Sequence, residues 1–166
     1  MSHPPHFSWR HFRADDTERV FELLSPPEVR RYLTLPTPFL PKHAAEIVNK
    51  CMTRPLPHPA VMVDGELAGC IKANLTPNKN AREVMIAYWY GVNYHGKGLA
   101  SAVLQRFLSL LKEQYPELVT AHAFTHSDNL ASQRVLLKCG FECRGDISDF
   151  QGEALPAAVL HFTLKF

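Results

Sequence analysis

The segment YHGKGLASAVLQ, residues 94–105, places two glycines and a lysine directly before a pattern that is typical of a helix. Glycine costs about 0.5–1 kcal/mol relative to alanine inside regular structure, so Gly96 and Gly98 indicate a backbone that bends sharply or is closely approached. A helix N-terminus after such a bend presents free N–H groups and partial positive charge. This arrangement can bind a phosphate or pyrophosphate, although an unliganded tight turn would use the same glycines.

Two well-known phosphate-binding motifs match this segment only in part. Residues 91–97 read GxxxxGK, but Gly98 follows where a P-loop needs Ser or Thr to place a hydroxyl on Mg²⁺. GKGLAS begins like the dinucleotide fingerprint GxGxxG, but Ser101 replaces its third glycine and several predicted strands come before it. Both motifs are therefore disfavoured.

Hydrophobic patterns on either side define the elements that position this segment. Residues 82–92, REVMIAYWYGV, predict a strand, and the apolar residues after the glycines recur at helical spacing up to Pro116. The glycine segment therefore joins a strand to an amphipathic helix. The apolar residues of that helix are Ala100, Val103, Leu104, Phe107, Leu108 and Leu111.

Further elements surround this unit. Ten of the 13 prolines lie between Pro4 and Pro59, which predicts short helices and rigid loops in the first third. Asp64-Gly65 predicts a type I′ hairpin, and Asp15 with Glu18 has the spacing of a capping box after a first strand. The remaining predictions are a first strand at residues 7–12, a strand at 119–124, a helix at 127–140 capped by Ser127 or Asp128 and followed by Gly140, and strands at 141–145 and 157–166.

Composition limits the class of protein. A chain of 166 residues with 46% hydrophobic content predicts a single domain over residues 1–166 with a sizeable core. No apolar run approaches the roughly 20 residues of a membrane span. A net charge of +2 argues against nucleic-acid binding, and four cysteines without paired spacing favour a reduced, cytoplasmic protein. The cysteines are Cys51, Cys70, Cys139 and Cys143.

The histidines and cysteines invite other interpretations. None of the nine histidines has HExxH spacing, and His122 and His126 lie on a predicted strand and its exit, where a spacing of four does not converge. We therefore expect no metal site. His122 alternates with Thr120 and Phe124 on one strand face, which leaves open a packed, a surface or an acyl-site role. Cys139 is expected to be a small buried hydrophobic residue.

Two motifs together resemble a known family. HGKGLA, with His95, Gly98 and Ala100, matches the spacing of the Q/R-x-x-G-x-G/A pyrophosphate motif of the GCN5-related N-acetyltransferases, the GNAT superfamily. NLASQRVLLKCGFE resembles the later N-x-x-[AS]…GF segment of that family. DDTERVFELLSPPEVRRYL is similar to the opening helices of the branch that acetylates N-terminal alanine and serine of ribosomal proteins.

The resemblance implies a fold and a cosubstrate. The fold is mixed α+β, with a mostly antiparallel, splayed central sheet flanked by helices on both faces, and acetyl-CoA lies where the sheet splays. Tyr88, Trp89 and Tyr90 match backbone contacts to the acetyl group and pantetheine arm, and Asn129 matches a further pantetheine contact. The aromatic run could equally be core packing, and Asn129 a helix cap. The residues that match the pyrophosphate loop are His95, Gly96, Lys97, Gly98, Leu99, Ala100 and Ser101.

The implied reaction is direct attack of a neutral amine on the thioester of acetyl-CoA. Many family members protonate the departing thiolate with a tyrosine seven residues after the motif asparagine, but this position is Leu136 here. In the ribosomal-protein branch a serine takes that role, and Ser132 matches it. A carboxylate before the last strand is matched by Asp149, as base or amine anchor. A main-chain N–H of residues 88–90 is the expected oxyanion donor.

The acceptor is the least specified partner. The loop GDISDFQGEALP, residues 145–156, carries three carboxylates and no basic residue, which fits a solvated acidic turn or a surface that attracts a cationic amine. The resemblance implies that this loop borders the acceptor end of the cleft, with residues 35–41 as the opposite lip. A peptide α-amine has a reference pKa of about 7.7–8.0, so it needs less assistance from the site to lose its proton than a lysine amine does. Polyamines, aminoglycosides and a catalytically weak acyl-CoA sensor are alternatives, and monomer and homodimer both stay open. The carboxylates are those of Asp146, Asp149 and Glu153.

Overall fold

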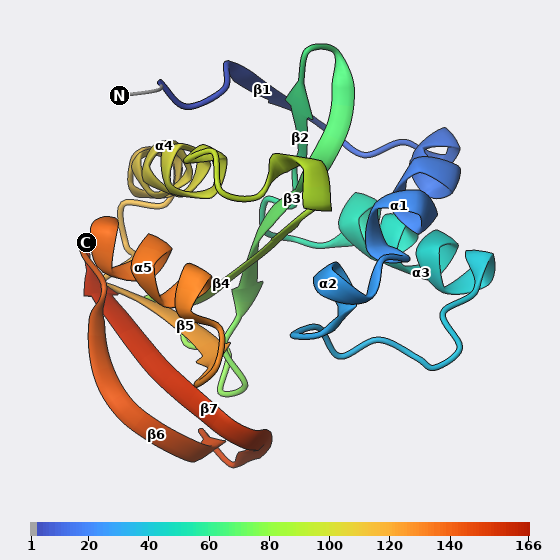
Figure 1. Ribbon diagram of the computed structural model, residues 1–166. Coiled ribbons are helices and arrows are strands. Elements are labelled where there is room, and N and C mark those ends of the chain that lie inside the picture. The colour runs from blue at the N-terminus through green and yellow to red at the C-terminus, as the bar shows by residue number, and fades with distance from the viewer. Residues whose placement is uncertain (1–2) are drawn as a thin grey trace. The chain divides into compact units, whose positions relative to one another are not determined.

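The computed structural model describes residues 3–166 (Figure 1). The chain divides into two compact units. Unit 1 contains the chain up to Lys72 together with Tyr88–Ala100, and unit 2 contains Ala73–Ala87 and Ser101–Phe166. The seven strands are hydrogen-bonded in the order β1-β2-β3-β4-β5-β7-β6. The expected mixed α+β fold, a sheet flanked by helices, is therefore confirmed, while the single domain over residues 1–166 stays a prediction.

The elements have the following bounds. The helices are α1 (Thr17–Leu24), α2 (Pro27–Arg30), α3 (Pro41–Thr53), α4 (Leu99–Gln114) and α5 (Leu130–Lys138), with short 3₁₀ turns at Ala14–Asp16 and Val92–Tyr94. The strands are β1 (Phe7–Arg10), β2 (Ala60–Val63), β3 (Glu66–Leu75), β4 (Glu83–Tyr90), β5 (Thr120–His126), β6 (Glu142–Phe150) and β7 (Glu153–Lys165). No helix within residues 3–166 is both long and apolar enough to cross a membrane.

Unit 1 begins with an antiparallel arrangement of β1, β2 and β3. The turn between β2 and β3 has positive φ at both central residues, 51° at Asp64 and 80° at Gly65, so the predicted type I′ hairpin is confirmed. Helices α1 and α3 pack together and bury their apolar faces in one core. That core includes Val20, Leu23, Leu24, Ala44, Val48, Ala60, Leu67 and Trp89.

The start of the first helix differs from the prediction. Asp16, rather than Asp15, organises this turn, because its carboxylate accepts the Arg13 backbone N–H at 2.8 Å and two guanidinium N–H groups of Arg10 at 2.8 and 2.9 Å. The hydrogen bonds from Arg10 lower the pKa of the Asp16 carboxyl. The predicted capping box of Asp15 and Glu18 is therefore wrong. Arg10, which forms this ion pair, is also the last residue of β1, which ends there instead of at residue 12.

Unit 2 is organised around β5. Its pairing with β4 is parallel and covers only three residue pairs, Glu83–Met85 with Thr120–His122, whereas its antiparallel pairing with β7 runs the full length of β5. Helices α4 and α5 are joined by a weak contact between the Cys139 thiol and the Ser101 carbonyl at 3.5 Å. Cys139 is only half-buried, so the expectation of a buried hydrophobic residue is met in part.

The two final strands are longer than the sequence indicated. Residues 145–156 were expected to form a loop, but most of them extend β6 and β7 into a long curved hairpin (Figure 1). Its tight turn lies at Gln151 and Gly152, with φ of 52° and 87°. Alternating exposed polar residues such as Asp146 and Ser148 gave this segment a loop-like composition, because one face of the hairpin meets solvent.

The cap of α5 also differs from the prediction. Asn129 is the N-cap, and its side-chain oxygen accepts the Ser132 backbone N–H at 3.2 Å. The helix-cap interpretation of Asn129 is therefore confirmed, while neither Ser127 nor Asp128 caps this helix. Gly140 follows the end of the helix with φ of 91°, as predicted for a left-handed C-terminal position.

Gly69 in β3 provides a test of how tightly unit 1 is built. A Cβ at this position would lie 2.2 Å from the Trp89 carbonyl oxygen and 2.5 Å from Cδ1 of Tyr90. We therefore expect Gly69→Val to destabilise the protein by about 1–3 kcal/mol or more, because the obstructing group is backbone that must move. Urea unfolding measures this loss. Gly65→Asn is the matched control, since it meets open space and tolerates a left-handed conformation. Equal stability of the two variants would contradict the close approach.

Candidate functional site

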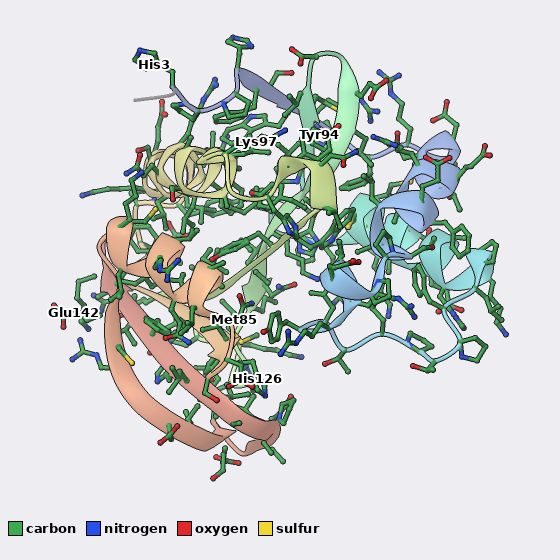
Figure 2. All side chains as sticks on the ribbon, in the orientation of Figure 1. His3, Met85, Tyr94, Lys97, His126 and Glu142 are labelled. Atoms are coloured by element: carbon green, nitrogen blue, oxygen red, sulfur yellow. The ribbon has the colours of Figure 1, made fainter. Side chains whose placement is uncertain are left out.

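The glycine segment between β4 and α4 is a bare turn in the structure. Gly96 and Gly98 have φ of 70° and 77°, a left-handed conformation that other residues adopt only with strain. A Cβ on Gly96 would meet no atom within 4 Å, and one on Gly98 would meet only Pro4, at 3.7 Å. The turn therefore exposes its backbone at the point where the chain enters α4. Figure 2 labels Tyr94 and Lys97 beside this turn.

Hydrogen bonds anchor the turn to the end of β4. The His95 imidazole donates from Nε2 to the Tyr90 carbonyl oxygen at 2.8 Å, which leaves Nδ1 as the acceptor nitrogen. The Gly91 N–H donates to the Ala68 carbonyl at 2.9 Å. The Tyr94 hydroxyl accepts a hydrogen bond from the Arg19 guanidinium at 3.4 Å. The backbone before the two glycines is thus held in place while the glycines themselves stay uncovered.

The aromatic run at the end of β4 is mostly buried. Trp89 and Tyr90 are 8% and 6% exposed, so the inside-outside alternation of the strand breaks at its last two residues, and Tyr88 is half-buried. The rings of Tyr88 and Tyr90 lie 6.1 Å apart. Core packing of these side chains is therefore real. It does not compete with a ligand for the peptide groups, because the contacts that the resemblance implies are made by the backbone.

Unit 2 carries the remaining predicted residues at the start of α5. Asn129 and Ser132 are adjacent there, joined by the capping hydrogen bond, and both are half-buried. Leu136, one turn further, is 1% exposed. The residue that replaces the expected tyrosine thus belongs to the core and has no chemistry to offer.

The predicted carboxylates lie on the β6–β7 hairpin. Asp149 is exposed near the tip of this hairpin, and its Oδ1 accepts the Gly152 N–H at 3.1 Å, a typical turn-stabilising contact. Asp146 is exposed and lines an open hollow of about 360 Å³ together with Ser148 and Pro156. The structure therefore groups the acidic residues on one hairpin and gives Asp149 a structural partner.

The structure also contains an imidazole pair that the sequence did not indicate. His122 on β5 and His161 on β7 are hydrogen-bonded through Nδ1 and Nε2 at 3.0 Å. Only His122 had been singled out, since it alternates on a predicted strand. Its partner is 39 residues away, and the pairing follows from the register of β5 and β7, which no local pattern reveals.

A thiol pair in unit 1 has an unusual electrostatic environment. A hydrogen bond with Cys70, with help from His58, lowers the pKa of the Cys51 thiol to about 5, although burial opposes this shift. The same hydrogen bond and full burial raise the pKa of Cys70. No group of three or more His, Cys, Asp or Glu side chains in the described chain, residues 3–166, is arranged to hold a metal ion.

Comparison with known proteins follows the geometry. A family model described as an acetyltransferase (GNAT) domain matches residues 8–142. No curated protein sequence matches the chain. Among solved structures, an acetyltransferase of the GNAT family from Bacillus anthracis has a TM-score of 0.80 at 22% identity, over 99% of this chain and 97% of that chain.

Two further structures have different substrates in their names. RimL, a ribosomal L7/L12 alpha-N-protein acetyltransferase in complex with coenzyme A, has a TM-score of 0.79 at 16% identity, over 96% of this chain and 93% of that one. The aminoglycoside acetyltransferase AAC(6′)-Ib in complex with coenzyme A and kanamycin has a TM-score of 0.74 at 17% identity, with 94% of both chains covered. At these identities the likeness concerns the fold.

Proposed function

Because the chain belongs to the acetyltransferase (GNAT) family, we propose that it transfers the acetyl group of acetyl-CoA to the α-amine of a peptide or protein. The observation that carries this proposal is the bare, left-handed turn at Gly96 and Gly98 between β4 and α4. A long helix that begins behind uncovered backbone N–H groups is suited to a pyrophosphate. The proposal includes a cytoplasmic location, for which the free cysteines of the described residues are favourable.

The cosubstrate is assigned to the residues that match the family motifs. The turn from His95 to Ser101 would hold the pyrophosphate of acetyl-CoA, with the His95–Tyr90 hydrogen bond fixing its start. Peptide groups of residues 88–90 would contact the acetyl and pantetheine groups, and Asn129 would contact the pantetheine arm. A backbone N–H of the same β4 segment would stabilise the oxyanion that forms when the amine attacks.

Two side chains are assigned to proton chemistry. Ser132 would protonate the CoA thiolate as it departs, because Leu136 is buried and apolar. Asp149 would act as base or as an anchor for the amine. Its carboxylate can keep the Gly152 hydrogen bond on one oxygen and use the other for a cation.

An α-amine is the preferred acceptor class for a physical reason. Its reference pKa of about 7.7–8.0 leaves a useful neutral fraction near pH 7, whereas a lysine amine near 10.4 is almost fully protonated. The likeness to RimL is consistent with this choice. A small cationic amine is the second candidate, favoured by the exposed carboxylates on the β6–β7 hairpin and by the likeness to AAC(6′)-Ib. Both monomer and homodimer are compatible with these roles.

The acceptor assignment predicts the outcome of a substrate panel. We expect thiol release from acetyl-CoA with peptides that begin with alanine or serine, and none with the same peptides carrying a blocked N-terminus. Spermidine and kanamycin represent the second candidate. Asp146→Asn with Glu153→Gln should raise KM for cationic acceptors most strongly at low salt, because these exposed charges are screened. Tight acetyl-CoA binding with no turnover of any amine would instead indicate an acyl-CoA sensor.

The glycine turn predicts a loss of cofactor affinity. Gly98→Val should weaken acetyl-CoA binding at least tenfold, because it strains a left-handed position and places a branched side chain where the phosphates would lie. Isothermal calorimetry on the folded variant measures this change. Gly145→Val is the matched control, since Gly145 has φ of 97° and open space around it on the β6–β7 hairpin. Unchanged affinity in Gly98→Val would refute the assignment.

The proton-transfer residues predict a separation of turnover from binding. Ser132→Ala should lower kcat by about 10²–10⁴ with acetyl-CoA affinity nearly intact, if the hydroxyl is the general acid. Asp149→Asn should lower kcat if the carboxylate is the base, and raise KM for the amine if it is an anchor. Steady-state kinetics over both substrates distinguish these results. Wild-type constants in both variants would leave Ser132 and Asp149 as structural residues only.

A further inference from the structure

The imidazole pair of unit 2 lies in an aromatic cluster on one face of β5 and β7. The rings of His122 and His161 are stacked, with centroids 5.2 Å apart and an interplanar angle of 15°. Phe150 contacts both rings, and Phe124 stacks on His161 at 4.9 Å. His122 is 7% exposed. Two titratable rings are therefore packed against aromatic side chains, with His122 buried and His161 half-buried.

Hydrogen-bond partners fix which nitrogen carries each proton. Nε2 of His122 is buried, makes no hydrogen bond within residues 3–166, and lies 3.8 Å from Oε2 of Glu83. Because a carboxylate only accepts, the tautomer that suits this neighbour has the proton on Nε2. Nδ1 of His122 is then the acceptor in the 3.0 Å bond, and Nε2 of His161 is the donor. In this tautomer the lone pair of His161 lies on its remaining nitrogen, Nδ1.

Burial, assisted by nearby positive charges, keeps both imidazoles neutral. Burial lowers the pKa of His122, with Lys165 acting in the same direction and Glu83 opposing it. Burial also lowers the pKa of His161, and His122 and Arg144 add to this effect. These groups come from β4, β6 and β7, the strands that surround the pair. Since the ordinary pKa of histidine is about 6.5, both imidazoles are uncharged at pH 7 and the lone pair is available.

The pair lies where β5 loses its neighbour. The β4–β5 ladder ends at the pair of Met85 with His122, although β5 continues to His126. His161 is paired with Phe124, two residues beyond the end of that ladder. Within residues 3–166, the peptide groups of β5 beyond His122 therefore have a strand partner on the β7 side alone, and Asn129, assigned to the cosubstrate, follows three residues after β5 ends. His161 lies on β7 opposite this part of β5.

We propose that His161 and His122 form a proton relay for the acceptor amine, in which Nδ1 of His161 accepts the ammonium proton and Nε2 of His122 releases one to Glu83. Glu83 is suited to the last step, because its side chain is 25% exposed and can return the proton to water. Its Oε2 is held by the Gln151 amide at 2.8 Å. Protonation of His122 would draw this carboxylate in from 3.8 Å, since the two groups then carry opposite charges.

The proton balance agrees with this assignment. An ammonium acceptor and acetyl-CoA give an amide, CoA thiol and one proton. The relay removes the first proton of the ammonium, so that the nitrogen lone pair can attack the thioester carbon. After the C–S bond breaks, the thiolate gains a proton from Ser132, which is replenished by the second proton lost from the nitrogen. His161 is then a catalytic residue, His122 is a positioning residue, and Asp149 keeps the role of amine anchor.

The relay depends on the proposed N-acetyltransferase function and is tested by the pH dependence of kcat/KM. In the wild type the acid limb should reflect the imidazole pair and have its midpoint below 6.5, because the enzyme deprotonates the bound amine itself. His161→Gln and His122→Asn each keep one amide in place of the paired nitrogen but cannot take up the proton. In these variants only the neutral amine reacts, so the midpoint should move to about 7.7–8.0, the pKa of an α-amine.

The expected loss therefore depends on pH. With a peptide that begins with alanine, kcat/KM of each variant should be about 100-fold below the wild-type value at pH 6 and within about threefold of it at pH 9. The reason is that the neutral fraction of the amine limits the rate of the variants. Glu83→Gln should slow turnover, but the midpoint of its acid limb should not move to the pKa of the amine. His11→Gln, an exposed histidine outside the cluster, should leave the whole profile unchanged. A folded His161→Gln variant with the wild-type midpoint would overturn the relay.

A second measurement needs only the wild type, in case the buried substitutions prevent folding. The alanine-headed peptide and spermidine carry amines of different pKa, near 8 and near 10. A wild-type midpoint that is the same for both acceptors supports the relay, and one that follows the acceptor overturns it. If peptides are inert but spermidine or kanamycin is acetylated, the α-amine assignment fails while the relay is still measured. Inertness toward every amine would overturn both.

Discussion

The early end of the β4–β5 ladder is the constraint on which the rest of the chemistry depends. The two strands are parallel neighbours for only three residue pairs, yet each continues for several residues beyond the last pair. A buried peptide group without a hydrogen-bond partner costs free energy. The peptide groups beyond the last β4–β5 pair therefore need hydrogen bonds from another source. On β5 the opposite edge is paired with β7 over the whole strand, so β5 keeps its place in the sheet beyond the last pair with β4. The proposed function assigns the unpaired edge of β5 to the cosubstrate and the acceptor.

Backbone hydrogen bonds also determine the structure of the turn before α4. Two left-handed glycines leave positions 96 and 98 of the turn without side chains, and hydrogen bonds of the preceding residues replace the rigidity that glycine lacks. His95 fixes the turn to the last carbonyl of β4, and Gly91 fixes it to β3. Gly69 serves the opposite purpose in the neighbouring strand, where the missing Cβ lets the Trp89 carbonyl approach. The exposed turn before α4 and the close contact between β3 and β4 both depend on glycines, because glycine has no Cβ.

Local patterns predicted the elements well, because local residues determine them. The type I′ turn at Asp64 and Gly65, the strand-turn-helix around the two glycines, and Gly140 after α5 all follow from backbone conformations that few residue types tolerate. The caps were predicted less well, since several polar neighbours can satisfy the same N–H groups. Asp16 prevailed over Asp15 because Arg10, from another element, holds its carboxylate.

The features that the sequence could not reveal depend on contacts between distant residues. The β6–β7 hairpin has loop-like composition, and only pairing of its two halves shows that residues such as Asp149 lie in a strand. The imidazole pair requires the register between β5 and β7, together with Glu83 from a third strand. The position of a single histidine in the alternation of a strand predicts which face of the sheet it lies on. Its chemistry depends on the residues that the neighbouring strands place beside it.

The proton requirements of the reaction explain why the missing tyrosine is tolerable. A thiol has a reference pKa near 8.5, so near pH 7 a CoA thiolate is protonated favourably by the second proton that the nitrogen loses on forming the amide. The amine must lose its proton before it can attack, so help on the amine side changes the rate directly. Burying His122 with an unsatisfied N–H costs about 1–3 kcal/mol, a cost that aliphatic packing would avoid. The proposed relay would give this cost a purpose, because it supplies a base for the amine in a chain whose buried Leu136 has no proton to donate.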